Sequence, residues 1–133
     1  GNYVELGSDK TFFPEYVFPQ SWVVNPKFLK EHPDEVKKFV SAWSKANDFR
    51  IKNIDEAIKL TAAFTQVPAA SLKVQVGTTQ WIDSKKEITY FKDGTVNKWF
   101  TNLEKLFVKN GKMKNVVKAD KFVVSKPYLD AVQ

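Results

Sequence analysis

The chain has 133 residues and a mass of 15.3 kDa, which is the size of a single domain. Hydrophobic residues make up 43% of it and aromatic residues 14%, which excludes a disordered chain. It has no cysteine and a single histidine, His32, so disulfides, thiolate metal sites and a multi-histidine zinc site within the chain are excluded. No apolar run approaches the roughly 20 residues of a membrane span, and no signal peptide opens the sequence. Because it begins with Gly1 rather than methionine, we expect a processed chain or a fragment.

The net charge of +6 is concentrated in the second half of the chain. Residues 67–133 hold twelve lysines and six acidic residues, whereas residues 1–66 are balanced. Arg50 is the only arginine, and proteins that read nucleic-acid bases rely on arginine for bidentate contacts. We therefore expect a solvated lysine surface rather than a nucleic-acid site, although such a surface also attracts anions at long range.

The hydrophobic pattern predicts a mostly α-helical chain with one or two short strands. Residues 1–14 read as irregular, and residues 16–25 as an extended segment at a sheet edge, because Pro19 blocks a helix there. A second short extended stretch is predicted at residues 116–117, and an extended loop or hairpin at residues 80–91. Helices are predicted at residues 26–30, 33–52, 54–65, 69–78, 95–109, 118–123 and 126–132.

Three sequence signals set the expected helix ends. Proline at the first helical position favours starts at Pro26 and Pro33. Asn53 followed by Glu56 reads as a capping box for the helix at residues 54–65. Gly111 can adopt the positive φ that ends the helix at residues 95–109.

Few side chains carry a catalytic signature. His32 lies at a helix start, where a capping or surface role is more common than general-base catalysis. The carboxylate pair at residues 34–35 and that at residues 55–56 fall in first helical turns, where they complement the helix dipole. No phosphate-binding glycine loop or EF-hand pattern is present. The aromatic residues of the extended segment, at positions 12–22, and Trp81 either pack on the core or line a cleft.

The segment from Val23 to Val40, VVNPKFLKEHPDEVKKFV, resembles the post-hinge segment of periplasmic-binding-protein-like (type 2) solute receptors of ABC importers. The most similar group is that of the aliphatic sulfonate, taurine, nitrate and thiamine-pyrimidine receptors. Residues 46–57 resemble the family's next helix-to-helix step, with Ile54 where the family usually has proline. Residues 99–111 and 118–123 resemble its late helix and tail.

The resemblance implies that the chain is the C-terminal portion of a two-lobe α/β fold. Residues 1–25 would then be the end of the second lobe and the return hinge, and residues 26–133 the C-terminal helical region of the first lobe. Such receptors are more than twice as long, so we expect uncovered apolar faces and a companion: either the missing remainder of the receptor or a self-associated copy.

The implied function is that of a solute-binding component of an ABC importer, periplasmic or otherwise extracytoplasmic and associated with the cell surface. It would bind a small anionic or polar solute such as an alkanesulfonate between the lobes and deliver it to the permease, without enzymatic activity or a cofactor. Contact with a membrane would come only through a lipid anchor on the missing N-terminus. The expected ligand-binding residues are Glu15, Tyr16 and Phe18, near the hinge crossing, and Trp81.

Two alternatives remain open at this point. A thiamine-pyrimidine synthase-like enzyme is related to these receptors, but its cysteine-rich motif and reactive histidine are not in this chain. A helical interaction or nucleic-acid-binding module would use the lysine-rich second half, and its affinity would fall steeply with salt.

Overall fold

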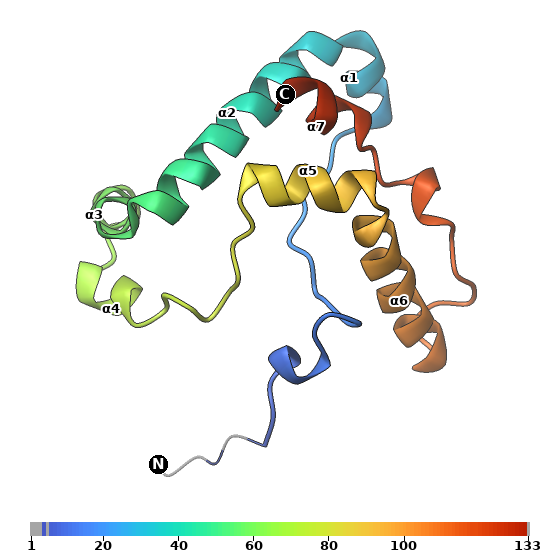
Figure 1. Ribbon diagram of the computed structural model, residues 1–133, viewed down its shortest axis with the longest axis horizontal. Coiled ribbons are helices and arrows are strands. Elements are labelled where there is room, and N and C mark those ends of the chain that lie inside the picture. Colours follow the sequence, from blue (N-terminus) through green and yellow to red (C-terminus); the bar gives the residue numbers. More distant parts are fainter. Residues whose placement is uncertain (1–3, 5, 133) are drawn as a thin grey trace.

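The computed structural model describes residue 4 and residues 6–132, and every regular element in these residues is a helix (Figure 1). Two are short 3-10 helices and seven are α-helices. In chain order they are η1 (Asp9–Phe12), α1 (Pro26–Glu31), α2 (Pro33–Lys52), α3 (Ile54–Thr65), α4 (Ala69–Lys73), α5 (Ser84–Lys92), α6 (Thr95–Lys109), η2 (Ala119–Lys121) and α7 (Lys126–Ala131).

The expected strands, and with them the expected portion of a two-lobe α/β fold, are wrong for this chain. The described residues contain no strand and no sheet. Residues 16–25 are non-helical, but no second segment runs beside them to form a ladder, and a strand exists only through such pairing. At residues 116–117 the Val117 N–H donates to the Glu104 carboxylate, over 3.1 Å, instead of to another strand.

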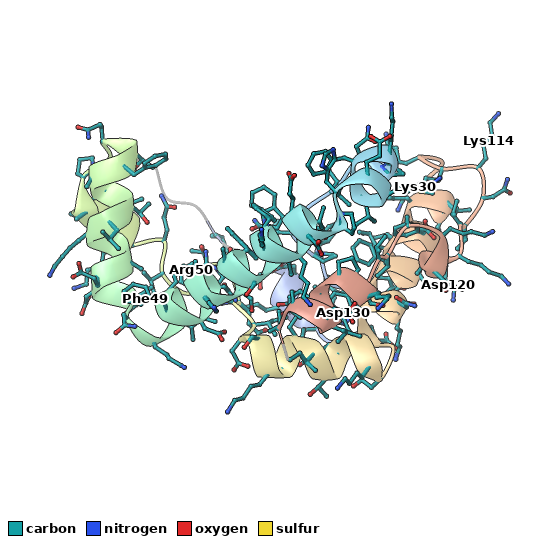
Figure 2. The ribbon with its side chains drawn as sticks, turned by 90° about the horizontal axis from the view of Figure 1, so that it is seen from above. Lys30, Phe49, Arg50, Lys114, Asp120 and Asp130 are labelled. Carbon is teal, nitrogen blue, oxygen red and sulfur yellow. The ribbon has the colours of Figure 1, made fainter. Side chains whose placement is uncertain are left out.

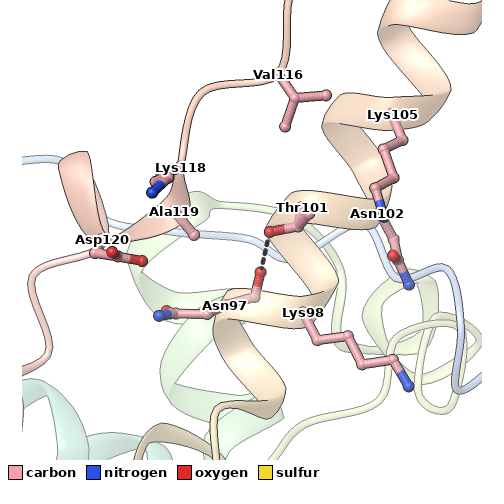
Figure 3. A pocket seen from close by; sticks show the side chains of 9 residues that line it. All are labelled: Asn97, Lys98, Thr101, Asn102, Lys105, Val116, Lys118, Ala119 and Asp120. Carbon is pink, nitrogen blue, oxygen red and sulfur yellow. Dashed lines mark hydrogen bonds between the residues drawn. The ribbon is translucent and has the colours of Figure 1, made fainter.

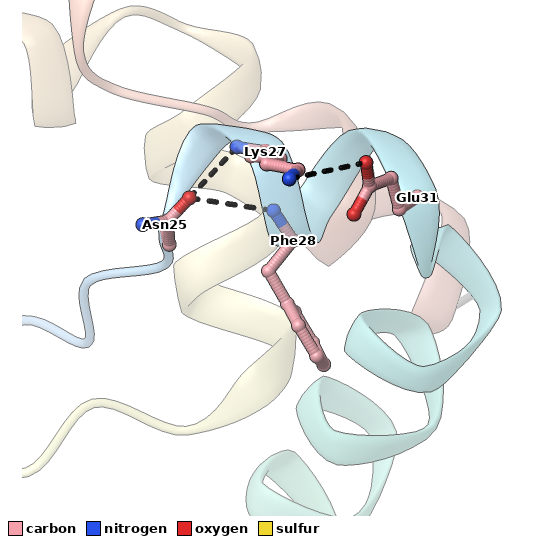
Figure 4. Close-up of polar contacts among 4 residues, drawn as sticks. All are labelled: Asn25, Lys27, Phe28 and Glu31. Carbon is pink, nitrogen blue, oxygen red and sulfur yellow. Dashed lines mark hydrogen bonds and ion pairs between the residues drawn. The ribbon is translucent and has the colours of Figure 1, made fainter.

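The start of the helical region follows its sequence signals closely. Asn25 caps α1, since its Oδ1 accepts from the backbone N–H of Lys27 at 2.9 Å and of Phe28 at 3.4 Å (Figure 4). An exposed ion pair, 3.9 Å long, joins the Lys27 and Glu31 side chains along the same helix. The predicted proline starts of α1 and α2 are confirmed, as is the end of α2 at Lys52.

Asn53 separates α2 from α3 but does not act as the predicted capping box. Its side-chain Nδ2 donates backward to the Phe49 carbonyl at 3.0 Å, and no side-chain bond caps the start of α3. The residue thus stabilises the end of the preceding helix rather than the start of the next.

Two predictions in the middle of the chain are wrong. The helix expected over residues 69–78 ends at Lys73, and the chain then turns toward Gly77, whose φ of +86° suits glycine. The loop or hairpin expected over residues 80–91 is largely the helix α5. Asp83 begins it as an N-cap, accepting from the Lys86 N–H at 2.9 Å.

The helices pack around α2. Helices α7, α5, α1 and α3 each contact it, α6 packs on α5, and η2 lies on α6. Helix α4 packs on α3, and together they form an arm at the far end of α2 (Figures 1 and 2). The predicted end of α6 is confirmed at Gly111, with φ +66°.

The chain buries little apolar surface. Among the described residues the buried hydrophobic side chains are Val36, Trp99, Ala119 and Tyr128. The accessible area is 10614 Å², whereas a compact monomer of this mass exposes about 7,100 Å². The difference is about 3,500 Å². Large hydrophobic side chains such as Phe64, 90% exposed, and Trp22, 64% exposed, lie on this surface, so the expectation of uncovered apolar faces is confirmed.

Candidate functional site

The N-terminal segment that carries three of the expected site residues is fastened to α6. Trp99 donates its indole Nε1–H to the Pro14 carbonyl at 3.1 Å, and Asn102 donates Nδ2–H to the Glu15 carbonyl at 2.8 Å. These two donors lie three residues apart and therefore share one face of α6. The main chain at residues 14–15 is thereby fixed against that face.

The side chains of this segment stay accessible. Glu15 is exposed, Tyr16 is 37% exposed and Phe18 is 58% exposed. An anchored backbone with accessible aromatic and acidic side chains is an arrangement that can contact a ligand or a partner surface, because ordering it on binding costs little additional entropy.

The fourth expected site residue, Trp81, is held by α2. The Arg50 guanidinium lies 3.8 Å from the centroid of the Trp81 ring, a cation–π geometry. The Arg50 Nη2 also donates to the Asn47 Oδ1 at 2.5 Å, and Asn47 in turn donates to the Ile82 carbonyl at 2.8 Å. The sole arginine of the chain therefore positions Trp81 rather than an external phosphate.

A carboxylate completes this attachment. Asp48 accepts from the Ser84 backbone N–H at 2.8 Å and from its hydroxyl at 2.6 Å. Burial alone would raise the pKa of Asp48, but the Ser84 hydrogen bonds and the positive charges of Lys52 and Lys85 together lower it. We call the contacts of residues 47, 48 and 50 with residues 81, 82 and 84 the α2 clamp.

The expected site residues form two groups rather than one cluster. Glu15, Tyr16 and Phe18 follow the segment on α6, whereas the Trp81 ring stacks on Arg50. Near these groups the two chain segments are joined by a hydrogen bond from the Lys10 Nζ to the Gly77 carbonyl, 3.3 Å long. Local sequence patterns could not reveal this division, because it depends on contacts between residues more than 30 positions apart.

Replacing Arg50 by lysine tests the clamp. Lysine keeps the charge but loses the planar stack and the fork of donors, so we expect a loss of about 1 kcal/mol in the free energy of unfolding. We also expect the indole N–H resonance of Trp81 to move. Lys45→Gln, at an exposed residue of the same helix, should change neither measurement. An unmoved Trp81 resonance in Arg50→Lys would show that the stack does not form.

A groove between α6 and the segment that leads into η2, including the first residues of η2, was not predicted from the sequence. Its volume is about 410 Å³. It is lined by mostly polar and charged side chains together with two apolar ones: Asn97, Lys98, Thr101, Asn102, Lys105, Val116, Lys118, Ala119 and Asp120 (Figure 3). Thr101 uses its hydroxyl internally, donating to the Asn97 carbonyl at 2.8 Å. The available signal was the spacing of Lys98 and Lys105, seven residues apart on one helical face.

A buried polar cluster joins α7 to α5 and α2. The Tyr128 hydroxyl donates to the Glu87 Oε2 at 2.7 Å, beside Ser44, which is only 4% exposed. Burial raises the pKa of Glu87, the hydrogen bond from Tyr128 partly opposes this, and the negative charge of Asp48 adds to it. Burial raises the pKa of the Tyr128 phenol well above its ordinary value. The Glu87 carboxylate, which accepts the phenol's hydrogen bond, raises this pKa further.

His32 occupies the junction of α1 and α2. Its ring stacks on Phe28 with 4.7 Å between centroids, and its Nδ1 lies 3.2 Å from the Glu35 Oε1. In residues 4 and 6–132 no group of three or more His, Cys, Asp or Glu side chains is placed to hold a metal ion. None of the helices in that part of the chain is long and apolar enough to cross a membrane.

Comparison with known proteins finds similarity to curated bacterial proteins. Curated proteins from Brucella abortus, Brucella suis and Brucella melitensis, each described as a "putative binding protein", are 30% identical to the chain over 112 residues. The aligned region covers 84% of this chain and 35% of each relative, so the chain spans about a third of their length. No family model matches the sequence, and no solved structure gives a significant match.

Proposed function

We propose that this chain is part of a solute-binding component of an ABC importer, which binds a small anionic or polar solute such as an alkanesulfonate. The observation that carries the proposal is the 30% identity, over most of the chain, to proteins described as binding proteins. The resemblance of the sequence to the sulfonate, taurine and nitrate receptors supplies the solute class. The proposal includes an extracytoplasmic location, an ABC permease as partner and the absence of enzymatic activity.

The large accessible surface supports a binding site shared with a further part of the protein. The chain exposes about 3,500 Å² more than a compact monomer of its mass. A standard interface covers only about 800 Å² per partner, so the excess is more than one contact with a second copy would cover. In this proposal the additional part covers a portion of the exposed apolar surface, and the solute lies where it meets Tyr16 and Phe18.

The proposal is tested by ligand binding to the full-length protein. We expect butanesulfonate, taurine or nitrate to raise the unfolding temperature, because a ligand at 100 times its Kd stabilises the folded state by about 2.7 kcal/mol. Isothermal titration then gives the affinity, with butanol as the uncharged control. An absence of any shift with these three solutes would contradict the solute class.

A matched pair of variants tests the expected aromatic contact. Phe18→Ala should weaken solute binding about tenfold, the effect of losing a contact worth about 1.4 kcal/mol. Phe64→Ala, at a residue that is 90% exposed on the α3 arm, should leave the affinity unchanged. Equal effects of the two substitutions would remove Phe18 from the site.

A helical interaction module remains a second candidate because of one exposed aromatic cluster. The Trp22 ring meets those of Phe39 and Trp43 edge to face, with centroids 5.2 and 5.0 Å away. Trp22 is nonetheless 64% exposed and Phe39 48%. Such clusters mark protein contacts. Stable association of the full-length protein with a second protein, without any solute binding, would favour this candidate.

A further inference from the structure

The end of the molecule formed by α6 and the segment after it carries an unbalanced positive charge. Between residues 95 and 124 there are seven lysines and two acidic residues. One of the two, Glu104, is only 9% exposed and its carboxylate accepts from the Val117 N–H at 3.1 Å. Asp120 is thus the one exposed acidic side chain in this region.

These lysines are exposed and available. The seven are Lys98, Lys105, Lys109, Lys112, Lys114, Lys118 and Lys121. The ion pairs found among the described residues lie elsewhere, on α1, α2, α3 and α7. Figure 2 shows Lys114 projecting outward from the loop after α6. The charge is therefore free to act on a partner.

Three of these lysines line the groove beside α6. Lys98 and Lys105 of α6 and Lys118 of the following segment lie around it, and Asp120 is the one carboxylate in its lining (Figure 3). Ammonium groups suit phosphate oxygens, which accept several hydrogen bonds at once. We name this surface, residues 97–121 around the groove, the lysine face.

Apolar side chains are exposed among the lysines. Val116 lines the groove and is 41% exposed, Phe122 is 43% exposed and Val124 is 50% exposed. Exposed apolar groups interleaved with lysine match the boundary of a bilayer, where apolar atoms enter the acyl region and ammonium groups remain at the headgroups. A nucleic acid offers no comparable apolar layer, and the lysine face has no arginine to read bases.

We propose that the lysine face is a peripheral contact site for a membrane surface rich in anionic phospholipid headgroups. The proposal rests on the proposed function, since a component that delivers solute to a permease works next to a bilayer. Each lysine near an anionic surface contributes a small, additive attraction to the phosphate headgroups. Because the attraction is electrostatic, it is reversible and sensitive to salt.

The test is sedimentation of the full-length protein with vesicles. We expect binding to vesicles of phosphatidylglycerol and phosphatidylcholine at low salt, little binding to phosphatidylcholine alone, and release near 1 M salt, where the Debye length is about 3 Å. The combined variant Lys98→Gln, Lys105→Gln, Lys118→Gln should weaken the partition coefficient roughly 100-fold.

A variant with the same loss of charge provides the control. Lys30→Gln, Lys37→Gln, Lys38→Gln removes three exposed lysines from α1 and α2, and should change the partition coefficient less than about threefold. An equal loss in both variants would show dependence on net charge alone and overturn the proposal. No binding to the anionic vesicles at low salt would also overturn it.

Two further measurements separate other partners. Displacement from the vesicles by millimolar glycerol phosphate would indicate a site for soluble phosphate esters. Tighter binding to an oligonucleotide than to the vesicles would indicate a nucleic-acid site. Either result would contradict the proposed membrane contact. Solute affinity is measured on the same variants. Vesicle binding without solute binding would support the lysine face and contradict the proposed function. Solute binding without vesicle binding would support the proposed function and contradict the lysine face.

Discussion

Replacing Trp99 by alanine is expected to lower the free energy of unfolding by about 3–5 kcal/mol, the largest effect of any single substitution considered for this chain. Trp99 is 6% exposed, in a chain whose buried apolar set is small. Its ring meets Tyr90 edge to face, with 5.0 Å between centroids, and its indole nitrogen holds the Pro14 carbonyl. The substitution therefore removes both the packing between α5 and α6 and the anchor of the N-terminal segment.

Trp99→Phe separates the two contributions. Phenylalanine keeps most of the aromatic packing and loses the hydrogen bond, so we expect a cost of about 1 kcal/mol, with greater mobility of residues 14–18. Urea denaturation of the full-length protein measures the free energies, and nuclear magnetic resonance follows the N-terminal segment. A cost below about 1 kcal/mol for Trp99→Ala would mean that this contact does not organise the core.

The second large effect is expected from the pH dependence of the buried cluster at Glu87. Because burial raises the pKa of Glu87 in the folded protein, the folded state binds more protons than the unfolded state between the ordinary value of 4.5 and the raised value. This group therefore makes the protein more stable as the pH falls through that interval. Below the ordinary Glu87 pKa of 4.5, this carboxyl is protonated in both the folded and the unfolded state, so its contribution to the free energy of unfolding no longer changes with pH.

Two substitutions should move this dependence in opposite directions. Glu87→Gln cannot ionise but still accepts from Tyr128, so its stability relative to the original protein should be greatest near neutral pH and decline as the pH falls toward 4.5. Tyr128→Phe removes the donor that partly stabilises the carboxylate, so the dependence should become larger and extend to higher pH. Urea denaturation across this pH range measures both differences, and parallel curves for all three proteins would contradict the assignment.

The long helices were predictable because their signals are local. Helix α2 has an apolar face repeating at helical spacing and a proline at its first turn, and α6 has such a face with Gly111 after its end. In α5 the N-cap Asp83 was a usable signal, but the polar run after it resembled a loop. What settles α5 as a helix lies elsewhere in the chain: Asp48 binds Ser84 at its start and Tyr128 binds Glu87 in its middle.

The wrong fold class has a different physical origin. The extended character of residues 16–25 was read from local composition, while a strand requires a neighbour that this chain does not place beside it. Exposed aromatic residues such as Trp22 gave the same local signal as a buried strand edge would. For the candidate site, the residue types Tyr16, Phe18 and Trp81 could be selected from sequence, but their separation into two groups depended on Arg50 and Asn102, which are distant in the chain.

The α2 clamp has a consequence for how the chain can vary in length. It fixes residues 47–50 beside residues 81–84. The segment from residue 51 to residue 80 therefore begins and ends at nearly the same place in the structure. Helices α3 and α4 pack on each other, and α3 also packs on α2. When the two ends of a segment are held together, the entropic cost of closing it grows only with the logarithm of its length, so the segment can be shortened or extended at little cost. The arm is therefore the place where insertions and deletions would be accommodated without disturbing α5, α6 and α7.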